Sequence, residues 1–213
     1  MIPYGTFTFF LIAFIVLIPV IILGFLGKRS YIYNGISTAI MIVIIFASDK
    51  HNLLGQKYLS AQLFCFIIYV IWQVALIMYY YQSRQRKNTF TKFVTIMVLS
   101  ILPLAIVKIL QSSWLGGHQI HFHESKLIEF VGFLGISYVT FKSVQLIMEI
   151  RDGSIKEIKV GKLIQFISFF PTISSGPIDR YKRFVKDDKK VPSGAEYREL
   201  VIKAIHMIML GFL

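Results

Sequence analysis

The sequence predicts an all-α fold: a polytopic membrane protein with about five or six transmembrane helices and a short re-entrant segment, in a single membrane-embedded domain over residues 1–213. Two observations support this prediction. Hydrophobic residues make up 55% of the chain, whereas only 11 of its 213 residues are acidic. The apolar residues also gather in long runs that are separated by short basic loops. Ordinary soluble domains have neither property.

Five apolar runs are predicted to span the membrane. The first covers residues 7–26, with no basic residues before it and no small-residue cleavage site after it, so we expect a retained helix rather than a signal peptide. The others cover 31–47, 58–81, 93–110 and 127–150. Aromatic side chains lie at the ends of the runs, as interfacial anchors do: Tyr31, Tyr58, Tyr79, Tyr80, Tyr81 and Trp114.

Lysine and arginine residues are divided unequally between the loops. The loops at 27–30, 82–92 and 151–162 carry ten of them, and the alternate loops carry only Lys50, Lys57 and Lys126. The positive-inside rule therefore predicts an extracellular N-terminus and three cytoplasmic basic loops. A net charge of +12 would suggest nucleic-acid binding in a soluble protein, but this distribution indicates membrane topology instead.

The stretch Q-F-I-S-F-F-P-T-I-S-S-G-P-I-D-R-Y-K-R-F at 165–184 departs from this pattern. Its apolar part, 163–173, is about a dozen residues long, whereas a spanning helix needs roughly 20. Pro171 lacks an amide hydrogen, and the next residues form a poor helix: Ser174, Ser175, Gly176 and Pro177. Such backbone is tolerated at membrane depth only against protein or a water-filled cavity, which predicts a re-entrant segment that lines a cavity from the cytoplasmic side. The alternative is a soluble-side loop after a short interfacial helix.

The last part of the sequence is helical in pattern again. From residue 195 the apolar periodicity returns, and 200–213 are mostly apolar, with Lys203 and His206 inside the run. We expect the first part of a sixth span, and therefore a chain that is part of a longer one. An amphipathic interfacial helix is the alternative.

One face of the fifth predicted span carries a polar stripe. Its members recur at i, i+3, i+4, i+7 and i+11: Tyr138, Phe141, Lys142, Gln145 and Glu149. A charge near the middle of a span is costly, so Lys142 is expected to face the protein interior and marks a functional-site hypothesis. Glu149 lies about 10 Å along the axis and is no obvious direct partner. The alternative is that Lys142 snorkels to the cytoplasmic interface, as we expect of Lys108.

The sequence gives weaker evidence for a metal site or a catalytic nucleophile than for a site at Lys142. His118, His121 and His123 cluster with Glu124 on the predicted outer side, but no Cys or nearby Asp completes a zinc set, so a solvated loop is favoured and no metal is predicted. The only cysteine, Cys65, excludes an intrachain disulfide. Serine catalysis has no support, since there is no G-x-S-x-G and no recognisable Ser/His/Asp arrangement.

Two motifs together resemble the membrane-bound O-acyltransferases. G-F-L-G-I-S-Y-V-T-F-K-S-V-Q-L-I-M-E-I-R-D-G at 132–153 is followed by S-F-F-P-T-I-S-S-G-P-I-D-R-Y at 168–181. The pair is similar to the N-terminal part of the family pattern, most closely in the members that D-alanylate teichoic acid in Gram-positive bacteria. The family's catalytic histidine, in a later membrane segment, has no match here. No catalytic residue is therefore assigned, and the isolated chain is expected to be inactive alone.

The resemblance implies O-acyl transfer across the cell membrane. Members of this kind take D-alanine as a thioester on the phosphopantetheine arm of a cytosolic D-alanyl carrier protein, with no bound cofactor, and deliver it to a hydroxyl of teichoic or lipoteichoic acid outside. Other membrane proteins of the D-alanylation pathway are further implied partners, and no nucleic acid is. The basic inner loops suit an acidic carrier protein.

The residues expected to bind the donor come from the polar stripe and from the interrupted part of the stretch at 165–184, which we call the broken stretch. They are Tyr138, Phe141, Lys142, Gln145, Pro171, Ser174, Ser175, Gly176, Pro177 and Arg180. A narrow passage through the protein would keep the thioester away from bulk water. Two alternatives remain open. One is O-acetylation of a secreted polysaccharide, which shares both motifs, and the other is a non-enzymatic transporter or channel subunit.

Overall fold

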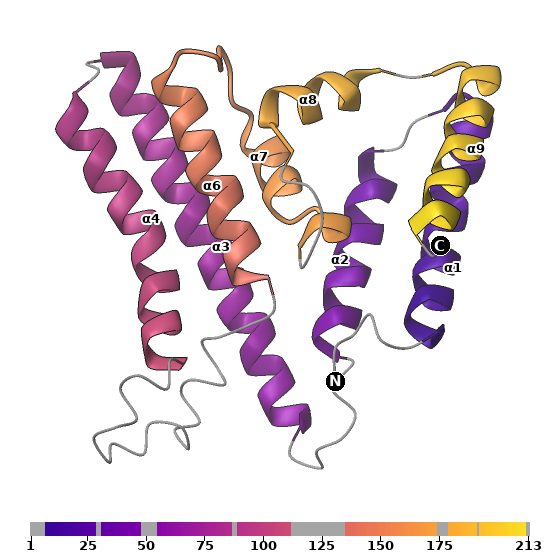
Figure 1. The fold of residues 1–213 in the computed structure, drawn as a ribbon, viewed down its shortest axis with the longest axis horizontal. Helices are drawn as coiled ribbons and strands as arrows, with labels where there is room; N and C mark the ends of the chain where they lie inside the picture. Colours follow the sequence, from indigo (N-terminus) through magenta and orange to yellow (C-terminus); the bar gives the residue numbers. More distant parts are fainter. Residues whose placement is uncertain are drawn as a thin grey trace. The chain divides into compact units, whose positions relative to one another are not determined.

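The computed structural model describes residues 7–28, 31–47, 55–86, 89–111, 135–173, 179–190 and 192–211. Within these ranges every regular element is helical, which confirms the predicted all-α class for this part of the chain (Figure 1). The chain forms two compact units, residues 1–48 with 186–213 and residues 49–185. In chain order the elements are α1 (Phe7–Phe25), α2 (Tyr31–Ala47), α3 (Gly55–Arg86), α4 (Phe90–Gln111), α6 (Ile136–Arg151), α7 (Val160–Ile167), η4 (Phe170–Thr172), α8 (Tyr181–Lys189) and α9 (Gly194–Gly211).

The unit at 49–185 is built on three helices, α3, α4 and α6, that lie side by side (Figure 1). The buried face of α6 carries Val139, Leu146, Ile147 and Ile150, each at most 1% exposed. Their spacing follows the helical period, so one stripe of apolar side chains fills the space between the helices. α3 and α4 also expose many large apolar side chains on their outer flanks. Such a surface is typical of helices that face lipid.

A hydrogen-bond network lies inside this bundle. The Gln73 amide nitrogen donates to the Tyr69 hydroxyl at 2.8 Å and to the Ser100 carbonyl at 3.0 Å. The Ser100 hydroxyl donates to Gln73 Oε1 at 2.7 Å, and the hydroxyl oxygens of Tyr69 and Thr140 are 2.6 Å apart. All four side chains are buried. The apolar side chains around them offer no hydrogen-bond partners, so these amide and hydroxyl groups bond to one another. The network therefore links α3, α4 and α6.

In the unit at 1–48 with 186–213, α1 ends in a Schellman motif. Gly27 has a φ of 62°, the left-handed conformation that favours glycine. The Lys28 N–H donates to the Leu23 carbonyl at 2.9 Å, and the Gly27 N–H donates to the Gly24 carbonyl at 3.0 Å. These bonds satisfy carbonyl groups that the end of a helix leaves free. The motif turns the chain out of α1 directly after the apolar run.

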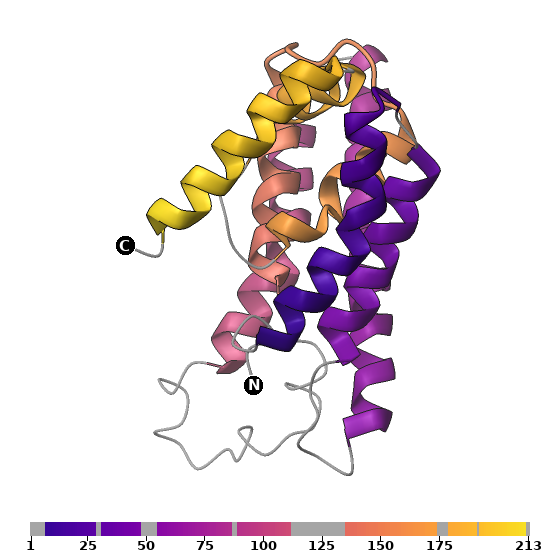
Figure 2. The ribbon, with the colours of Figure 1, turned by 90° about the vertical axis from the view of Figure 1, so that its right-hand side faces the viewer.

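α1 and α9 approach closely at one end and diverge toward the other (Figure 2). At the close end the ring of Tyr197 packs edge-on against Phe25, with centroids 5.2 Å apart. A side chain at Gly24 would overlap the Tyr197 ring, and a Cβ at Gly194 would lie 2.9 Å from the Phe25 carbonyl oxygen. Two glycines therefore permit the contact, as small residues commonly do between membrane helices.

The N-terminus of α9 carries a capping box. The Ser193 N–H donates to Glu196 Oε2 at 2.9 Å, and the Glu196 N–H donates to the Ser193 hydroxyl at 3.4 Å. The sequence S-G-A-E at 193–196 has the S-x-x-E spacing that this motif requires. It explains why α9 begins at Gly194, one residue before the helical pattern predicted from the sequence.

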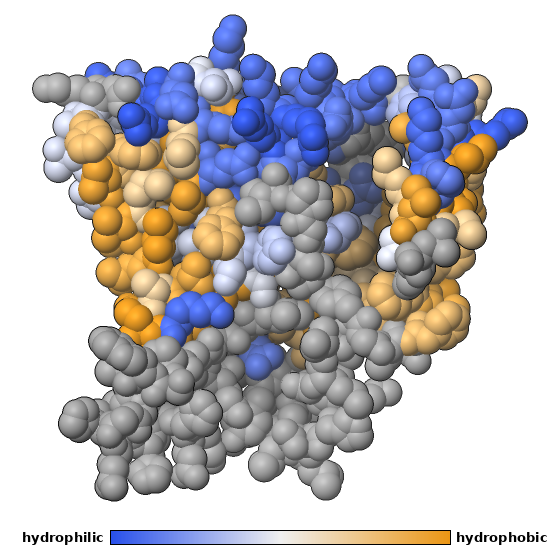
Figure 3. Space-filling view, viewed as in Figure 1, coloured by the Kyte–Doolittle hydropathy of each residue, from blue (hydrophilic) through white to orange (hydrophobic). Residues whose placement is uncertain are grey.

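Among the residues that the structure describes, two helices are long and apolar enough to cross a membrane, Gln62–Arg86 and Phe90–Ile109. Phe9–Phe25 and Ile32–Phe46 are shorter apolar helices. Hydrophobic side chains cover the flank of the unit at 49–185 below a hydrophilic end (Figure 3). These features fit membrane insertion. Four predicted spans coincide with α1 to α4, and the fifth coincides with α6 from Ile136 onward, because residues 112–134 lie outside the described ranges. The number of spans and the side of the N-terminus stay predictions.

Candidate functional site

Lys142 is the charged side chain at the centre of the candidate site. It extends from the middle of α6 and is only 1% exposed. Its ammonium donates to Thr172 Oγ1 at 2.6 Å, to the Phe166 carbonyl at 3.3 Å and to the Ile167 carbonyl at 3.5 Å. A lysine ammonium has three N–H donors, so each finds an acceptor in this arrangement. The prediction that Lys142 faces the interior is confirmed, and the snorkelling alternative is wrong.

The acceptors of Lys142 mark the place where the predicted re-entrant stretch breaks. α7 is only eight residues long and ends at Ile167, and the chain then passes through non-helical backbone at Phe169 into the 3-10 helix η4. The end of any helix leaves carbonyl oxygens without intrahelical partners and carries a partial negative charge. Lys142 supplies both the donors and the positive charge that this end requires. One ammonium group therefore joins α6, α7 and η4.

The break comes earlier than the sequence alone suggested. Pro171 was expected to interrupt the apolar stretch, but α7 stops four residues before it, and Pro171 instead occupies the first turn of η4, where a missing N–H costs nothing. The physical reason is that Lys142 takes the carbonyl oxygens of Phe166 and Ile167. A contact between residues so far apart in the sequence leaves no local signal.

Gly135 fixes the other boundary of the site. It precedes α6 with a φ of 92°, and a Cβ at this position would lie 2.5 Å from the Ile173 carbonyl oxygen. Ile173 itself is completely buried. The start of α6 therefore rests directly against the last described residue before 174–178. Sequence analysis quoted Gly135 only as part of a motif and did not assign it this role.

Glu149 connects the far end of the polar stripe to α8. Its carboxylate lies close to the Gln145 side chain and to the backbone of Lys182 in the first turn of α8. One carboxylate oxygen, Oε2, is buried and has no hydrogen-bond partner among the described residues. A carboxylate near a helix N-terminus complements the helix dipole. Glu149 therefore faces the start of α8 and is not a partner of Lys142, which agrees with the expectation from the sequence spacing.

The remaining predicted donor-binding residues are dispersed. Tyr138 and Gln145 are half-buried on α6, whereas Phe141 is 50% exposed and Arg180 is also exposed. Pro171 is exposed in η4. The other four predicted residues lie outside the described ranges: Ser174, Ser175, Gly176 and Pro177. The structure therefore joins Lys142 to the edge of the broken stretch, and the role of the whole set in binding a donor stays a prediction.

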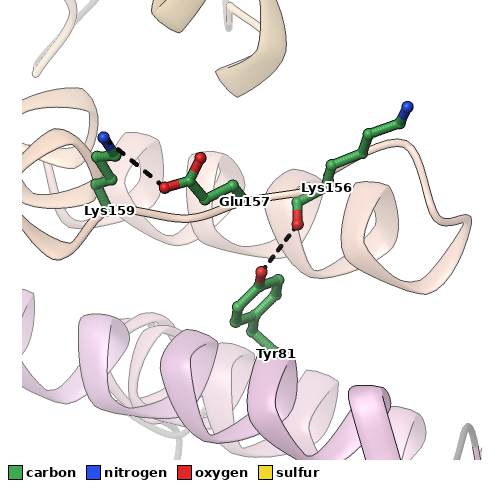
Figure 4. A network of polar contacts seen from close by, with 4 residues as sticks. All are labelled: Tyr81, Lys156, Glu157 and Lys159. Carbon is green, nitrogen blue, oxygen red and sulfur yellow. Dashed lines mark hydrogen bonds and ion pairs between the residues drawn. The ribbon is translucent and has the colours of Figure 1, made fainter.

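The connection between α6 and α7 is held by polar contacts with α3 (Figure 4). The Tyr81 hydroxyl donates to the Lys156 carbonyl at 3.0 Å, and Lys159 pairs with Glu157 at 3.7 Å across an exposed surface. Arg84 donates to the Arg151 carbonyl at 3.1 Å. Exposed ion pairs contribute little, so the two bonds from α3 to backbone carbonyls are the contacts that anchor this loop.

Burial and aromatic packing keep α7 and the first half of α8 together. The Phe166 ring packs against Tyr181 at 5.5 Å and against Phe184 at 5.4 Å between centroids, and Phe169 packs against Phe184 at 5.6 Å. Burial in this cluster raises the pKa of the Tyr181 hydroxyl. α8 is amphipathic, with its aromatic face on α7 and its lysines outward. This helix was not predicted from the sequence.

No group of three potential metal ligands occurs within the described ranges. The predicted outer cluster of His118, His121, His123 and Glu124 lies outside them. Cys65 is a free, half-buried thiol on α3.

Comparison with known proteins identifies relatives over the whole chain. It is 45% identical over 214 aligned residues to a teichoic acid D-alanyltransferase from Bacillus subtilis (strain 168), covering 100% of this chain and 50% of the relative. It is 43% identical to one from Lacticaseibacillus rhamnosus, covering 99% and 48%, and 33% identical to one from Streptococcus thermophilus, covering 99% and 46%. No protein-family model matches the chain.

The chain thus spans about half the length of the curated relatives that it matches. The similarity extends through both motifs, since it covers almost all of the chain. It confirms that the resemblance seen in the sequence is to teichoic acid D-alanyltransferases.

Proposed function

We propose that this chain forms part of a membrane acyltransferase that transfers D-alanine to hydroxyl groups of teichoic or lipoteichoic acid. The observation that carries the proposal is the similarity over almost the whole chain to three proteins named teichoic acid D-alanyltransferase. Two helices that fit membrane insertion agree with it. The activity belongs to the whole protein, because the chain corresponds to about half the length of these relatives.

We infer further that the donor is a D-alanyl thioester on the phosphopantetheine arm of a carrier protein, and that it passes the broken stretch that begins after Ile173. A thioester has to be kept from bulk water until it meets the acceptor hydroxyl. The contacts of Lys142 with α7 and η4 support this role, since they fix the backbone on which the stretch begins. Exposed lysines on the surface near α7 and α8 would attract an acidic carrier protein.

A chimera tests the proposal. The matching segment of the Bacillus subtilis relative would be replaced by this chain and expressed in cells that lack their own D-alanyltransferase. D-alanine esters released from teichoic acid by mild base would then be measured. We expect the chimera to restore most of the ester content given by the intact relative. A chimera that is expressed, inserted and yet without D-alanine esters would contradict the proposal.

A second measurement tests the identity of the acyl donor independently of the acceptor. The same membranes would be incubated with carrier protein charged with labelled D-alanine, and label would be followed into the teichoic acid fraction. Transfer that requires charged carrier protein supports the thioester donor. D-alanylation that proceeds equally from free D-alanine and ATP without carrier protein would overturn that inference and leave the D-alanyltransferase assignment intact.

A further inference from the structure

A cavity lies in the unit at 1–48 with 186–213, and its lining includes none of the residues proposed for D-alanine transfer. Its volume is about 180 Å³. This is smaller than the roughly 300–1,000 Å³ typical of pockets for drug-sized ligands, so the cavity suits a head group instead. Its lining comes from α1, α2, α9 and the chain around Lys190: Val20, Leu23, Gly24, Gly27, Lys28, Asn34, Asp187, Lys190, Pro192 and Tyr197.

The lining changes in chemistry along α1. Val20 and Leu23 provide apolar walls from within α1, whereas Lys28 follows the end of the helix at the Schellman motif. Lys190 adds a second cation from another segment of the same unit. A ligand that fits both parts has an anionic head and an apolar body.

The other polar side chains of the lining indicate which kind of anionic head group would fit the cavity. Asn34 offers an amide and Tyr197 a hydroxyl, both of which can donate to phosphate oxygens. Asp187 offers a carboxylate that only accepts hydrogen bonds at neutral pH, so it would repel a bare phosphate but bind a hydroxyl of the head group. The two lysines and one aspartate together give the lining a formal charge of +1. This charge balances one phosphodiester.

From this arrangement we propose that the cavity binds the hydroxyl-bearing phosphodiester head group of an anionic glycerophospholipid, with the acyl chains leaving along the apolar walls of α1. The location at the end of an apolar helix is where a phospholipid head group resides. The bound lipid contacts α1, α2 and α9 together and therefore holds α9 against α1. This binding site does not depend on the proposed acyl transfer.

Lipid binding to the complete 213-residue chain tests the proposal. The chain would be purified in a neutral detergent, and retention of phosphatidylglycerol or phosphatidylcholine would be titrated by native mass spectrometry. We expect phosphatidylglycerol to bind roughly tenfold more tightly than phosphatidylcholine. The double variant Lys28→Gln/Lys190→Gln should weaken phosphatidylglycerol binding by about tenfold, since each exposed cation near an anionic head group contributes only modestly. Equal affinity for the two lipids would overturn the proposal.

A matched control separates a defined site from general attraction to a basic surface. Lys156→Gln/Lys186→Gln removes the same charge from exposed lysines outside the cavity, and we expect a change of less than about twofold. Equal losses in both double variants would show surface attraction only and would overturn the site. Leu23→Trp, which fills the apolar wall, should also weaken binding. Soluble glycerol 1-phosphate should not displace the lipid; displacement would identify a free-anion site instead and contradict the lipid assignment.

Discussion

The ammonium nitrogen of Lys142 lies 2.6 Å from the hydroxyl oxygen of Thr172, although the two residues are 30 positions apart in the sequence. The same ammonium reaches two carbonyl oxygens at the end of α7. The end of α7 and the 3-10 helix η4 are thus both held by a residue on a different helix, and the strength of this link can be measured by changing either partner.

Lys142→Met keeps the aliphatic stem but removes all three donors. The carbonyl oxygens of Phe166 and Ile167 then lose a buried partner, so we expect the free energy of unfolding to fall by about 2 kcal/mol or more, because each unsatisfied buried group costs roughly 1–3 kcal/mol. The chimera that carries this change should lose D-alanine ester formation. Stability would be measured by thermal unfolding in detergent.

Lys108→Met is the matched control, since Lys108 is exposed near the end of α4. Lys108→Met should change neither the free energy of unfolding nor D-alanine ester formation appreciably. Unchanged stability and full ester formation in Lys142→Met would show that the Lys142 contacts organise nothing.

Gly135→Ala should destabilise the unit at 49–185. A Cβ at Gly135 would lie 2.5 Å from the Ile173 carbonyl, on backbone with a φ of 92°. We expect a loss of about 2 kcal/mol from left-handed strain and the displaced carbonyl. Gly161→Ala is the control, because nothing lies within 4 Å of its added Cβ and alanine favours a helix. Comparable unfolding temperatures for both variants would show that the Gly135 contact is not required.

The pair of Gln73 and Ser100 should show measurable coupling. Their side chains and the Ser100 carbonyl exchange hydrogen bonds of 2.7 and 3.0 Å in a buried position. A double-mutant cycle with Gln73→Leu and Ser100→Ala should give a coupling energy of about 0.6–1.7 kcal/mol, the range for such bonds between membrane helices. Gln82→Leu, at an exposed position of α3, should not couple with Ser100→Ala. Additive effects of Gln73→Leu and Ser100→Ala would contradict the network.

The capping box of α9 should make its stability depend on pH. The hydrogen bond from the Ser193 N–H lowers the pKa of the Glu196 carboxyl. A lowered pKa means that the contribution is complete above the ordinary glutamate pKa, about 4.3, and is lost as the pH falls through the folded-state value. Hydrogen exchange of the α9 amides should therefore accelerate at acidic pH, relative to Glu196→Gln, which keeps an acceptor but does not titrate. A constant difference between the two proteins from pH 7 to pH 3 would refute this.

Membrane topology is tested by labelling cysteines introduced into a Cys65→Ser background. Because loops 27–30, 82–92 and 151–162 carry most cations, a cysteine at Gln85 should react with an impermeant maleimide only after permeabilisation, and one at Gly117 should react in intact cells. The reverse pattern would show that the cation count gives the wrong orientation.

Helix positions were largely predictable because hydrophobic periodicity is a local property. α2 has the predicted bounds of 31–47, and α1 ends one residue before its predicted end at 26. Burial of Lys142 was also predictable, because a mid-helix charge in an apolar run is too costly to leave against lipid.

The partners of these residues were not predictable. Lys142 bonds to residues 24 to 30 positions away, and Glu149 lies close to the backbone of Lys182. Such contacts depend on how the chain returns after α6, for which no spacing rule exists. The Gln73 network was missed for the same reason: its members were visible as polar residues within apolar runs, but their mutual approach requires three helices to pack in one register.

The sequence separation within the Lys142 site has a consequence for biosynthesis. Lys142 leaves the ribosome 24 residues before Phe166 and 30 before Thr172, so α6 is made before any acceptor of its ammonium exists. If α6 spans the membrane, as the sequence predicts, a lysine at its centre costs about 2.5–3.5 kcal/mol on the translocon scale while it has no acceptor. In that case α6 would first be held by its contacts with the helices already made, α3 and α4, which include the pair of Tyr69 and Thr140. Synthesis of α7 and η4 would then supply the acceptors of the ammonium and offset this cost.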